Sequence, residues 1–158
     1  MRDTVTIRTA KEGDCPAIFE LIKELAKFEN AANQVDITTE TLRNDGFKKN
    51  PSYHCIVAES NNSIIGMALF YPRYSTWKGP YLYLEDLVVS DESRGQGIGS
   101  ALLNTVINEA RKQNSARLEW QVLDWNASAI EFYKKYEATL SDEWMNVRLT
   151  REQITELK

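Results

Sequence analysis

Cysteine and histidine are scarce in this chain of 158 residues, which contains two cysteines and one histidine. Cys15 and Cys55 form no CxxC pair, and His54 is the single imidazole, so the usual Cys and His ligands of a zinc site cannot be assembled. We therefore expect a functional site without a metal ion.

Long apolar runs and linkers are also missing. No apolar run approaches the roughly 18 residues that a membrane span needs, and the start, MRDTVTIRTAKEGDC, has no apolar h-region. We therefore expect a cytoplasmic protein without a membrane span. The sequence shows no internal repeat, no low-complexity tract and no Pro/Gly/Ser-rich linker, so we predict a single domain over residues 1–158.

An excess of positive charge is missing too. The net charge is −4, from 19 Lys and Arg against 23 Asp and Glu, and nucleic-acid binding usually needs a basic face, so a nucleic-acid partner is disfavoured. Mild acidity suits a cationic small substrate, although ordinary solubility is the simpler explanation. The composition, 42% apolar and 27% charged, is typical of a soluble globular domain.

Hydrophobic periodicity predicts an alternation of strands and helices. Their order, β-α-α-β-β-β-α-β-α-β, predicts an α/β fold, a mixed sandwich of a sheet and helices. The predicted strands cover residues 4–8, 53–59, 63–71, 81–89, 116–123 and 144–149. The predicted helices cover residues 15–29, 39–45, 100–112 and 127–136, with Asp14 and Asn126 as N-caps of the first and the last.

The segment DESRGQGIGS, residues 91–100, places three glycines between a predicted strand and a predicted helix. Glycine permits positive φ and close approach of a ligand, and N–H groups at a helix start attract phosphate. A Walker A loop fits poorly, because Ser100 stands where it needs lysine. A dinucleotide fingerprint also fits poorly, because the spacing is GxGxG and lies past the middle of the chain. This pattern alone leaves a phosphate site and a plain loop equally open.

The pattern Arg94-x-x-Gly97-x-Gly99, in a chain of this size and element order, resembles the acetyl-CoA pyrophosphate loop of the GNAT acetyltransferases. The resemblance extends over nearly the whole chain, through LIKELAKFE, DGF, YHCIVAE, YLYLED, RGQGIGS and DWN…FYK. These segments are similar to the branch that contains the diamine (spermidine/spermine) N1-acetyltransferases and thialysine Nε-acetyltransferase. KEGDC, YSTWKG and VLDWN favour the thialysine side.

This resemblance implies the GNAT fold, a mixed central sheet flanked by helices, with acetyl-CoA as co-substrate. It also implies a homodimer that acetylates the primary amine of a small substrate, either a thialysine- or lysine-like amino acid or a polyamine. A non-catalytic acyl-CoA-binding sensor or interaction module on the same fold is the alternative. The presence of Tyr133 and Glu85, which a pure binding module does not need, argues against that alternative.

The resemblance assigns acetyl-CoA to the glycine loop, the strand before it and the segment that begins at Asn126. The N–H groups of residues 95–100 would hold the pyrophosphate, and Arg94 would add charge. A splayed backbone at residues 87–89 would pair with the pantetheine amides, although periodicity alone reads these residues as core strand. The predicted cofactor-binding residues are Leu87, Val88, Val89, Arg94, Gly95, Gln96, Gly97, Ile98, Gly99, Ser100, Asn126, Ser128 and Ala129.

Acyl transfer to an amine needs a neutral amine and a proton for the departing thiolate. Tyr133 matches the branch's catalytic tyrosine, and we predict it as general acid; a packing role and Tyr136 are the alternatives. Glu85 matches the glutamate that helps deprotonate the amine through water, with a solvent-exposed strand end as its alternative. Because neighbouring strand residues face opposite ways, Asp86 is expected to be a separate contact or a structural partner.

Several positions match the amine side of the branch, but Trp77 and Trp144 could equally be packing aromatics. Diamine enzymes carry an acid before their Trp-x-Gly, where this chain has Ser75 and Thr76, which favours a shorter amine such as an amino acid. Glu137 replaces a glycine of many relatives and would cost roughly 1 kcal/mol if its φ is positive. The predicted substrate-binding residues are Phe28, Glu29, Trp77, Glu85, Asp86, Glu119, Trp120, Gln121 and Trp144.

Overall fold

The computed structural model describes residues 4–157, and the chain divides into two compact units, the first ending at Gln121 and the second beginning at Val122. The first unit contains one five-stranded sheet in the order β1-β2-β3-β4-β5. β1 to β4 pair antiparallel and β5 pairs parallel to β4, which gives the predicted mixed sheet. The strands are β1 (Thr6–Thr9), β2 (His54–Ser60), β3 (Ser63–Ser75), β4 (Gly79–Val89) and β5 (Leu118–Glu119).

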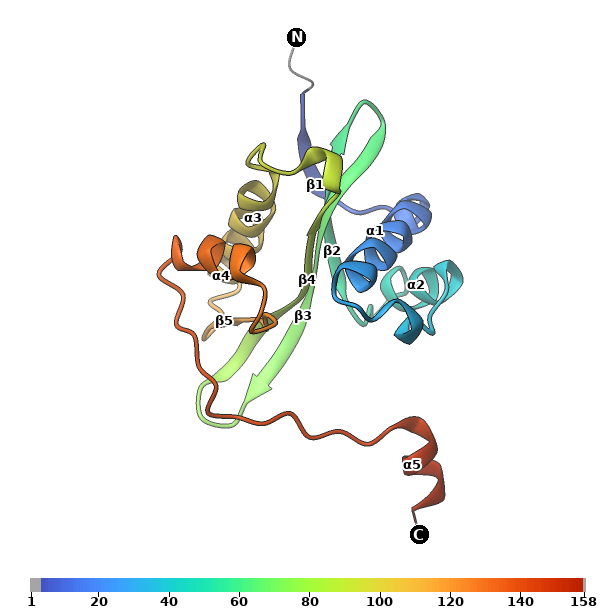
Figure 1. Ribbon diagram of the computed structural model, residues 1–158, viewed down its shortest axis with the longest axis vertical. Helices are drawn as coiled ribbons and strands as arrows, with labels where there is room; N and C mark the ends of the chain where they lie inside the picture. Colours follow the sequence, from blue (N-terminus) through green and yellow to red (C-terminus); the bar gives the residue numbers. More distant parts are fainter. Residues whose placement is uncertain (1–3, 158) are drawn as a thin grey trace. The chain divides into compact units, whose positions relative to one another are not determined.

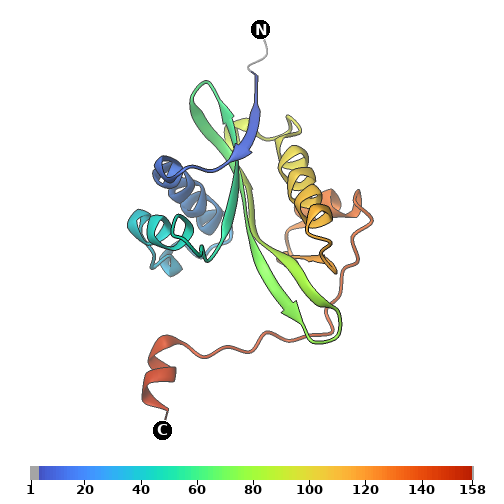
Figure 2. The same ribbon diagram turned by 180° about the vertical axis from the view of Figure 1, so that it is seen from behind.

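Three helices cover the two faces of this sheet. α1 (Cys15–Phe28) and α2 (Thr39–Gly46) lie on one side, and α3 (Ile98–Lys112) lies on the other (Figure 1). The view from behind shows the same arrangement (Figure 2). Short 3₁₀ turns cover residues 12–14, 32–34 and 91–93. The predicted fold class, a mixed sheet flanked by helices, is therefore confirmed.

The core follows the alternation of side chains along the strands. On the α1 side, Ile18 and Leu21 belong to one buried cluster with Val57 and Met67. On the other side, α3 packs closely against β3. Gly66 leaves little room there, since a Cβ added to it would lie 3.2 Å from Leu102 Cδ1. Apolar burial of this kind is the main favourable term that holds the helices on the sheet.

Local sequence signals explain several element ends. Asn61 and Asn62 both adopt positive φ between β2 and β3, as a two-residue hairpin turn requires. Asp14 stands just before α1 as predicted, but its carboxylate does not cap that helix. It accepts hydrogen bonds from Arg8 Nη1 and from the Lys11 N–H, both at 2.7 Å. The Arg8 guanidinium therefore holds this carboxylate and lowers the pKa of Asp14.

The second unit contains two helices, α4 (Ala127–Lys134) and α5 (Arg151–Glu156), and its described residues, 122–157, contain no strand. The predicted strand over 144–149 is wrong, because its apolar residues stay exposed and form no ladder there. β-propensity stabilises a strand only where a partner half-buries it. The predicted strand over 116–123 shortens to β5. α5 was not predicted, although Thr150 and Gln153 form its capping box.

Candidate functional site

Backbone conformation accounts for the glycines in the loop from β4 to α3. Gly95 and Gly97 have φ of 75° and 80°, and a Cβ added to either would meet nothing within 4 Å. Packing therefore does not demand glycine at these positions, whereas positive φ does. Gly97 is the N-cap of α3, and the first helical bond runs from the Ala101 N–H to the Gly97 carbonyl.

The N–H groups of residues 98–100 consequently have no acceptor within the helix, as at every helix start. Together with the positive end of the helix dipole they suit an anionic ligand, and the loop leaves room for close approach. The residues present therefore fit a pyrophosphate, and they lie where the sequence predicted the phosphate-binding loop.

Arg94 connects this loop to the end of α1. Its Nη2 lies 2.8 Å from Asp91 Oδ1, its Nε donates to the Val89 carbonyl at 3.2 Å, and its guanidinium lies 5.5 Å from the Phe28 ring centre. The Asp91 N–H also donates to Glu24 Oε1 on α1 at 2.8 Å. The predicted cofactor-side cation therefore contacts a predicted substrate-side aromatic residue, and the loop is fixed to α1 from two directions.

The strand before the loop loses its neighbour partway along. The ladder between β4 and β5 contains only the pairs Leu82–Leu118 and Tyr83–Glu119. Within the described part of the chain, Leu84 and residues 86–89 pair with β3 alone, so the other backbone edge of this segment has no strand partner. The Val88 side chain is buried in the core, which leaves the backbone as the part of residues 87–89 that this edge presents.

A β-bulge lies at Glu85. The register between β3 and β4 passes from the pair Leu69–Asp86 directly to Phe70–Leu84, so Glu85 is the extra residue. The Tyr71 hydroxyl donates to Glu85 Oε2 at 2.6 Å, and Tyr71 packs against the core cluster that contains Leu69. Both carboxylates therefore approach the sheet face covered by α1. The expectation that they face opposite ways is wrong, because the bulge interrupts the alternation.

Glu85, Asp86 and Glu29 form an acidic cluster at this face. Burial raises the pKa of Asp86 to about 7, and the nearby charges of Glu85 and Glu29 add to the effect. Burial also raises the pKa of Glu29, which directly follows α1. Within residues 4–157, no lysine or arginine forms an ion pair with any of the three. The cluster is therefore suited to a cationic ligand or to accepting a proton.

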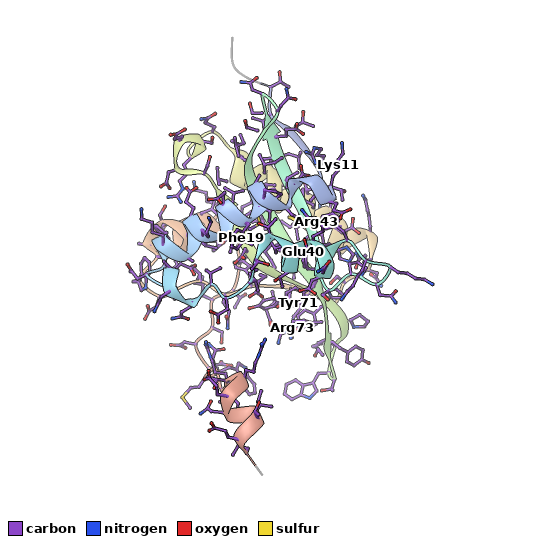
Figure 3. All side chains as sticks on the ribbon, turned by 90° about the vertical axis from the view of Figure 1, so that its right-hand side faces the viewer. Lys11, Phe19, Glu40, Arg43, Tyr71 and Arg73 are labelled. Carbon is purple, nitrogen blue, oxygen red and sulfur yellow. The ribbon has the colours of Figure 1, made fainter. Side chains whose placement is uncertain are left out.

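A row of aromatic and basic side chains continues from this acidic cluster along β3 and β4. The rings of Tyr71 and Tyr83 lie 5.6 Å apart, and the Arg73 guanidinium lies 4.5 Å from the Tyr83 ring centre. Figure 3 shows Tyr71 and Arg73 side by side, viewed from the side that α1 and α2 cover. Sequence reasoning missed this row; the alternating tyrosines of YLYLE were the available signal.

Glu119, a predicted substrate-side residue, already has several partners. Its carboxylate lies 3.0 Å from Arg117 Nε and 3.5 Å from Arg73 Nη1, and it accepts from the Tyr81 hydroxyl at 3.3 Å. The Arg117 guanidinium lies 4.2 Å from the Tyr81 ring centre. These contacts anchor Glu119 within the first unit. Trp120 and Gln121 follow β5 directly and close that unit.

The two predicted tryptophans of the amine side are both exposed. Trp77 lies in the turn between β3 and β4 with 86% of its surface accessible, and its N–H donates to Ser75 Oγ at 3.3 Å. Trp144 lies in the second unit and is 83% accessible. Neither tryptophan is therefore buried by its own unit, and each is accessible there for other contacts.

The second unit contains the predicted N-cap Asn126 and a shorter form of the predicted helix that follows it. Asn126 Oδ1 accepts from the Ala129 N–H at 3.2 Å, so this side chain caps α4, with Ser128 in the first turn.

Tyr133 lies in the last turn of α4 with its ring centre 5.3 Å from that of Phe132. The helix ends at Lys134 and not at Tyr136 as predicted. Glu137 has φ of 55°, which confirms that a non-glycine residue adopts positive φ there.

Two kinds of feature are absent from the described residues. Within residues 4–157, no group of three or more His, Cys, Asp or Glu side chains is placed to hold a metal ion. None of the described helices has the length and apolar character needed to cross a membrane.

Comparison with known proteins points in one direction. Residues 17–137 match the acetyltransferase (GNAT) family. The chain is 44% identical to thialysine N-epsilon-acetyltransferase from Bos taurus, over 97% of its own length and 96% of that protein. It is 36% identical to spermidine/spermine N(1)-acetyltransferase-like protein 1 from Homo sapiens, over 98% of its length and 24% of that protein. An integron cassette protein from the mobile metagenome of V. cholerae shares the fold, with a TM-score of 0.78, 24% identity and 96% coverage of both chains.

Proposed function

We propose that this chain, which belongs to the GNAT acetyltransferase family, acetylates the distal primary amine of a small lysine-like amino acid or polyamine. The family and the enzyme class predicted from the motifs are confirmed over nearly the whole chain. GNAT acetyltransferases use acetyl-CoA, which supplies an acetyl group activated as a thioester. The observation that carries the substrate proposal is the acidic cluster of Glu29, Glu85 and Asp86, which has no basic partner in residues 4–157.

The acidic cluster would first bind the substrate as an ammonium ion. An ammonium nitrogen cannot attack, so one proton must leave before the C–N bond forms, and a second proton leaves as the amide forms. We assign the first transfer to Glu85, through a water molecule, with Tyr71 holding that carboxylate in place at 2.6 Å. Asp86 supplies a second contact to the amine.

The C–S bond breaks as the C–N bond forms, and the departing thiolate needs one proton. We assign this proton to the Tyr133 hydroxyl, because a tyrosine hydroxyl placed at the leaving group can act as its general acid. Of the protons released by the ammonium, one replaces the proton lost by Tyr133 and one passes to solvent. The N–H groups at the free edge of residues 87–89 are the proposed donors to the carbonyl oxygen.

The remaining predicted residues divide between the two substrates. We propose that residues 95–100 and Arg94 hold the pyrophosphate, supported by the two open positive-φ glycines and the start of α3. On the amine side we retain Phe28 and Trp77, both exposed, together with the other predicted residues. Asn126, Ser128 and Ala129 stay proposed cofactor contacts.

We also propose a homodimer and a cytoplasmic location. Met145 and Val147 expose 89% and 92% of their surface beside Trp144, and apolar side chains that gather in this way are typical of interaction surfaces. Both cysteines are unpaired and buried, which suits a reducing compartment. We further propose that the whole chain acts as one GNAT domain, because the family match over residues 17–137 extends across the boundary after Gln121.

The test is release of free CoA from acetyl-CoA with thialysine, lysine, ornithine, putrescine, spermidine or spermine, with the acetylated amine identified by mass spectrometry. Wild type should turn over at least one of these amines. Tyr133→Phe and Glu85→Gln should each lower kcat at least tenfold while acetyl-CoA still raises the melting temperature. Binding of acetyl-CoA without turnover of any amine would instead favour the acyl-CoA-binding module.

A further inference from the structure

Arg73 is a cation placed just beyond the acidic cluster. It lies on β3 two residues after Tyr71, opposite Tyr81, and its guanidinium lies 4.5 Å from the ring centre of Tyr83. Tyr83 in turn stacks beside Tyr71, whose hydroxyl binds Glu85. One sheet face therefore presents carboxylates, then two tyrosine rings, then a guanidinium. Figure 3 labels Tyr71 and Arg73 of this row.

The present anionic partner of Arg73 holds it only weakly. Arg73 Nη1 lies 3.5 Å from Glu119 Oε1, which is longer than the roughly 2.7–2.9 Å of a good charge-assisted hydrogen bond. Glu119 has a closer guanidinium in Arg117, at 3.0 Å, and a donor hydroxyl in Tyr81. Arg73 can therefore turn to another carboxylate without leaving Glu119 unpaired, and its half-exposed side chain is accessible to a ligand.

The spacing along β3 matches the length of an amino acid with a distal amine. Tyr71, which holds Glu85, lies roughly 7 Å before Arg73 along the extended strand, whereas Leu69, the partner of Asp86, lies roughly 13 Å before it. The five bonds from the α-carbon to the distal nitrogen of lysine span about 6 Å when extended, from bonds of about 1.5 Å in a zigzag. An amine at Glu85 would thus place the α-carboxylate of the same molecule within reach of the Arg73 side chain.

We propose that Arg73 is a carboxylate-binding residue that selects zwitterionic amino acids with a distal amine over diamines and polyamines. This inference rests on the proposed function and specifies its substrate class. A guanidinium and a carboxylate form a strong paired hydrogen bond, whereas the second ammonium of a diamine meets a like charge at the same place. Selectivity then comes from attraction at one end of the site and repulsion at the same end for the wrong substrate.

The test compares lysine with cadaverine, the same carbon chain without the carboxylate, and with lysinamide, in which the carboxylate is uncharged. In the wild type, kcat/KM should rank lysine first. Arg73→Gln should lower kcat/KM for lysine roughly tenfold to hundredfold, mainly through KM, because a hydrogen bond to a charged group is lost. The same variant should leave cadaverine unchanged or improve it, and Arg73→Lys should restore part of the lysine activity.

Arg117→Gln is the matched control, because it removes the neighbouring guanidinium from the same tyrosine and glutamate cluster. It should change lysine and cadaverine by one common factor. Equal losses of lysine and cadaverine activity in Arg73→Gln, or a wild type that does not prefer lysine to lysinamide, would overturn the carboxylate site while leaving acetyltransfer intact. A wild type that binds acetyl-CoA but acetylates no amine would overturn the proposed function, and the carboxylate site with it.

Discussion

Replacing Asp86 by asparagine should stabilise the protein more at pH 8 than at pH 5. The pKa of Asp86 rises from an ordinary 3.8 to about 7 in the folded protein, because of burial and then the charges of Glu85 and Glu29. Each pH unit of this difference corresponds to about 1.4 kcal/mol, so ionised Asp86 costs the folded state about 4 kcal/mol. Because part of the side chain is in contact with water, we expect the measured cost to be smaller.

The direction of this pH dependence of stability follows from proton binding. Between pH 4 and pH 7 the folded protein holds a proton on Asp86 that the unfolded chain has lost, so this group makes stability fall as pH rises through that window. Above pH 7 both states are ionised and the cost is constant. About two of the three pH units between the unfolded and the folded pKa of Asp86 lie above pH 5. The stabilising effect of Asp86→Asn at pH 8 should therefore exceed its effect at pH 5 by roughly 1–3 kcal/mol.

The assay is urea unfolding of wild type and Asp86→Asn at pH 5, 6, 7 and 8, with stability extrapolated to water at each pH. Glu85→Gln serves as the companion variant, since removing its charge should reduce the pH dependence that Asp86 contributes without abolishing it. If Asp86→Asn stabilised the protein equally at every pH, or destabilised it at pH 8, Asp86 would have its ordinary pKa. Either result would refute the buried acidic cluster.

Two further predictions concern backbone conformation. Gly97→Ala should cost about 1 kcal/mol of stability from its positive φ alone, since no protein atom would contact the new Cβ, and should raise the KM for acetyl-CoA several-fold. Gly13→Ala, equally open but without positive φ, should do neither. Glu137→Gly should raise stability in urea by up to about 1 kcal/mol, because φ there is 55°, whereas Lys135→Gly, in the right-handed region, should lower it.

Much of the fold follows from local signals in the sequence. The first four predicted strands and the three helices that cover the sheet appear where the patterns predict them, because burial on one face selects each period. The segment 144–149 shows the limit of that reasoning. Its apolar alternation is real, but a strand also needs a partner for its backbone groups, and none of the described residues of that unit supplies one.

The candidate site was predictable in its residues but not in its geometry. Glu85 and Asp86 are identifiable as carboxylates in an apolar strand, where charge is costly. That both approach one face depends on a bulge, and a single extra residue leaves no mark on a period-2 pattern beyond one polar position. Arg73 carried no signal at all, since a basic residue near a turn is usually solvated; only its stacking on Tyr83 shows its place.

Two features of β4 lie close together, the bulge at Glu85 in its pairing with β3 and the end of its ladder to β5. The ladder to β5 ends at Tyr83, two residues before the bulge, so the free backbone edge begins where the carboxylates converge. Bulges increase local twist and interrupt pairing, and they re-aim the side chains beside them. The bulge therefore accounts for the proposed proton acceptor on the α1 face of β4, whereas the open backbone edge on the other side follows from the short ladder to β5. Regular pairing with β3 would turn Glu85 to the face opposite that of Asp86 but would leave the β5 edge open, so the proposed amine site and the proposed cofactor edge meet here for two separate reasons.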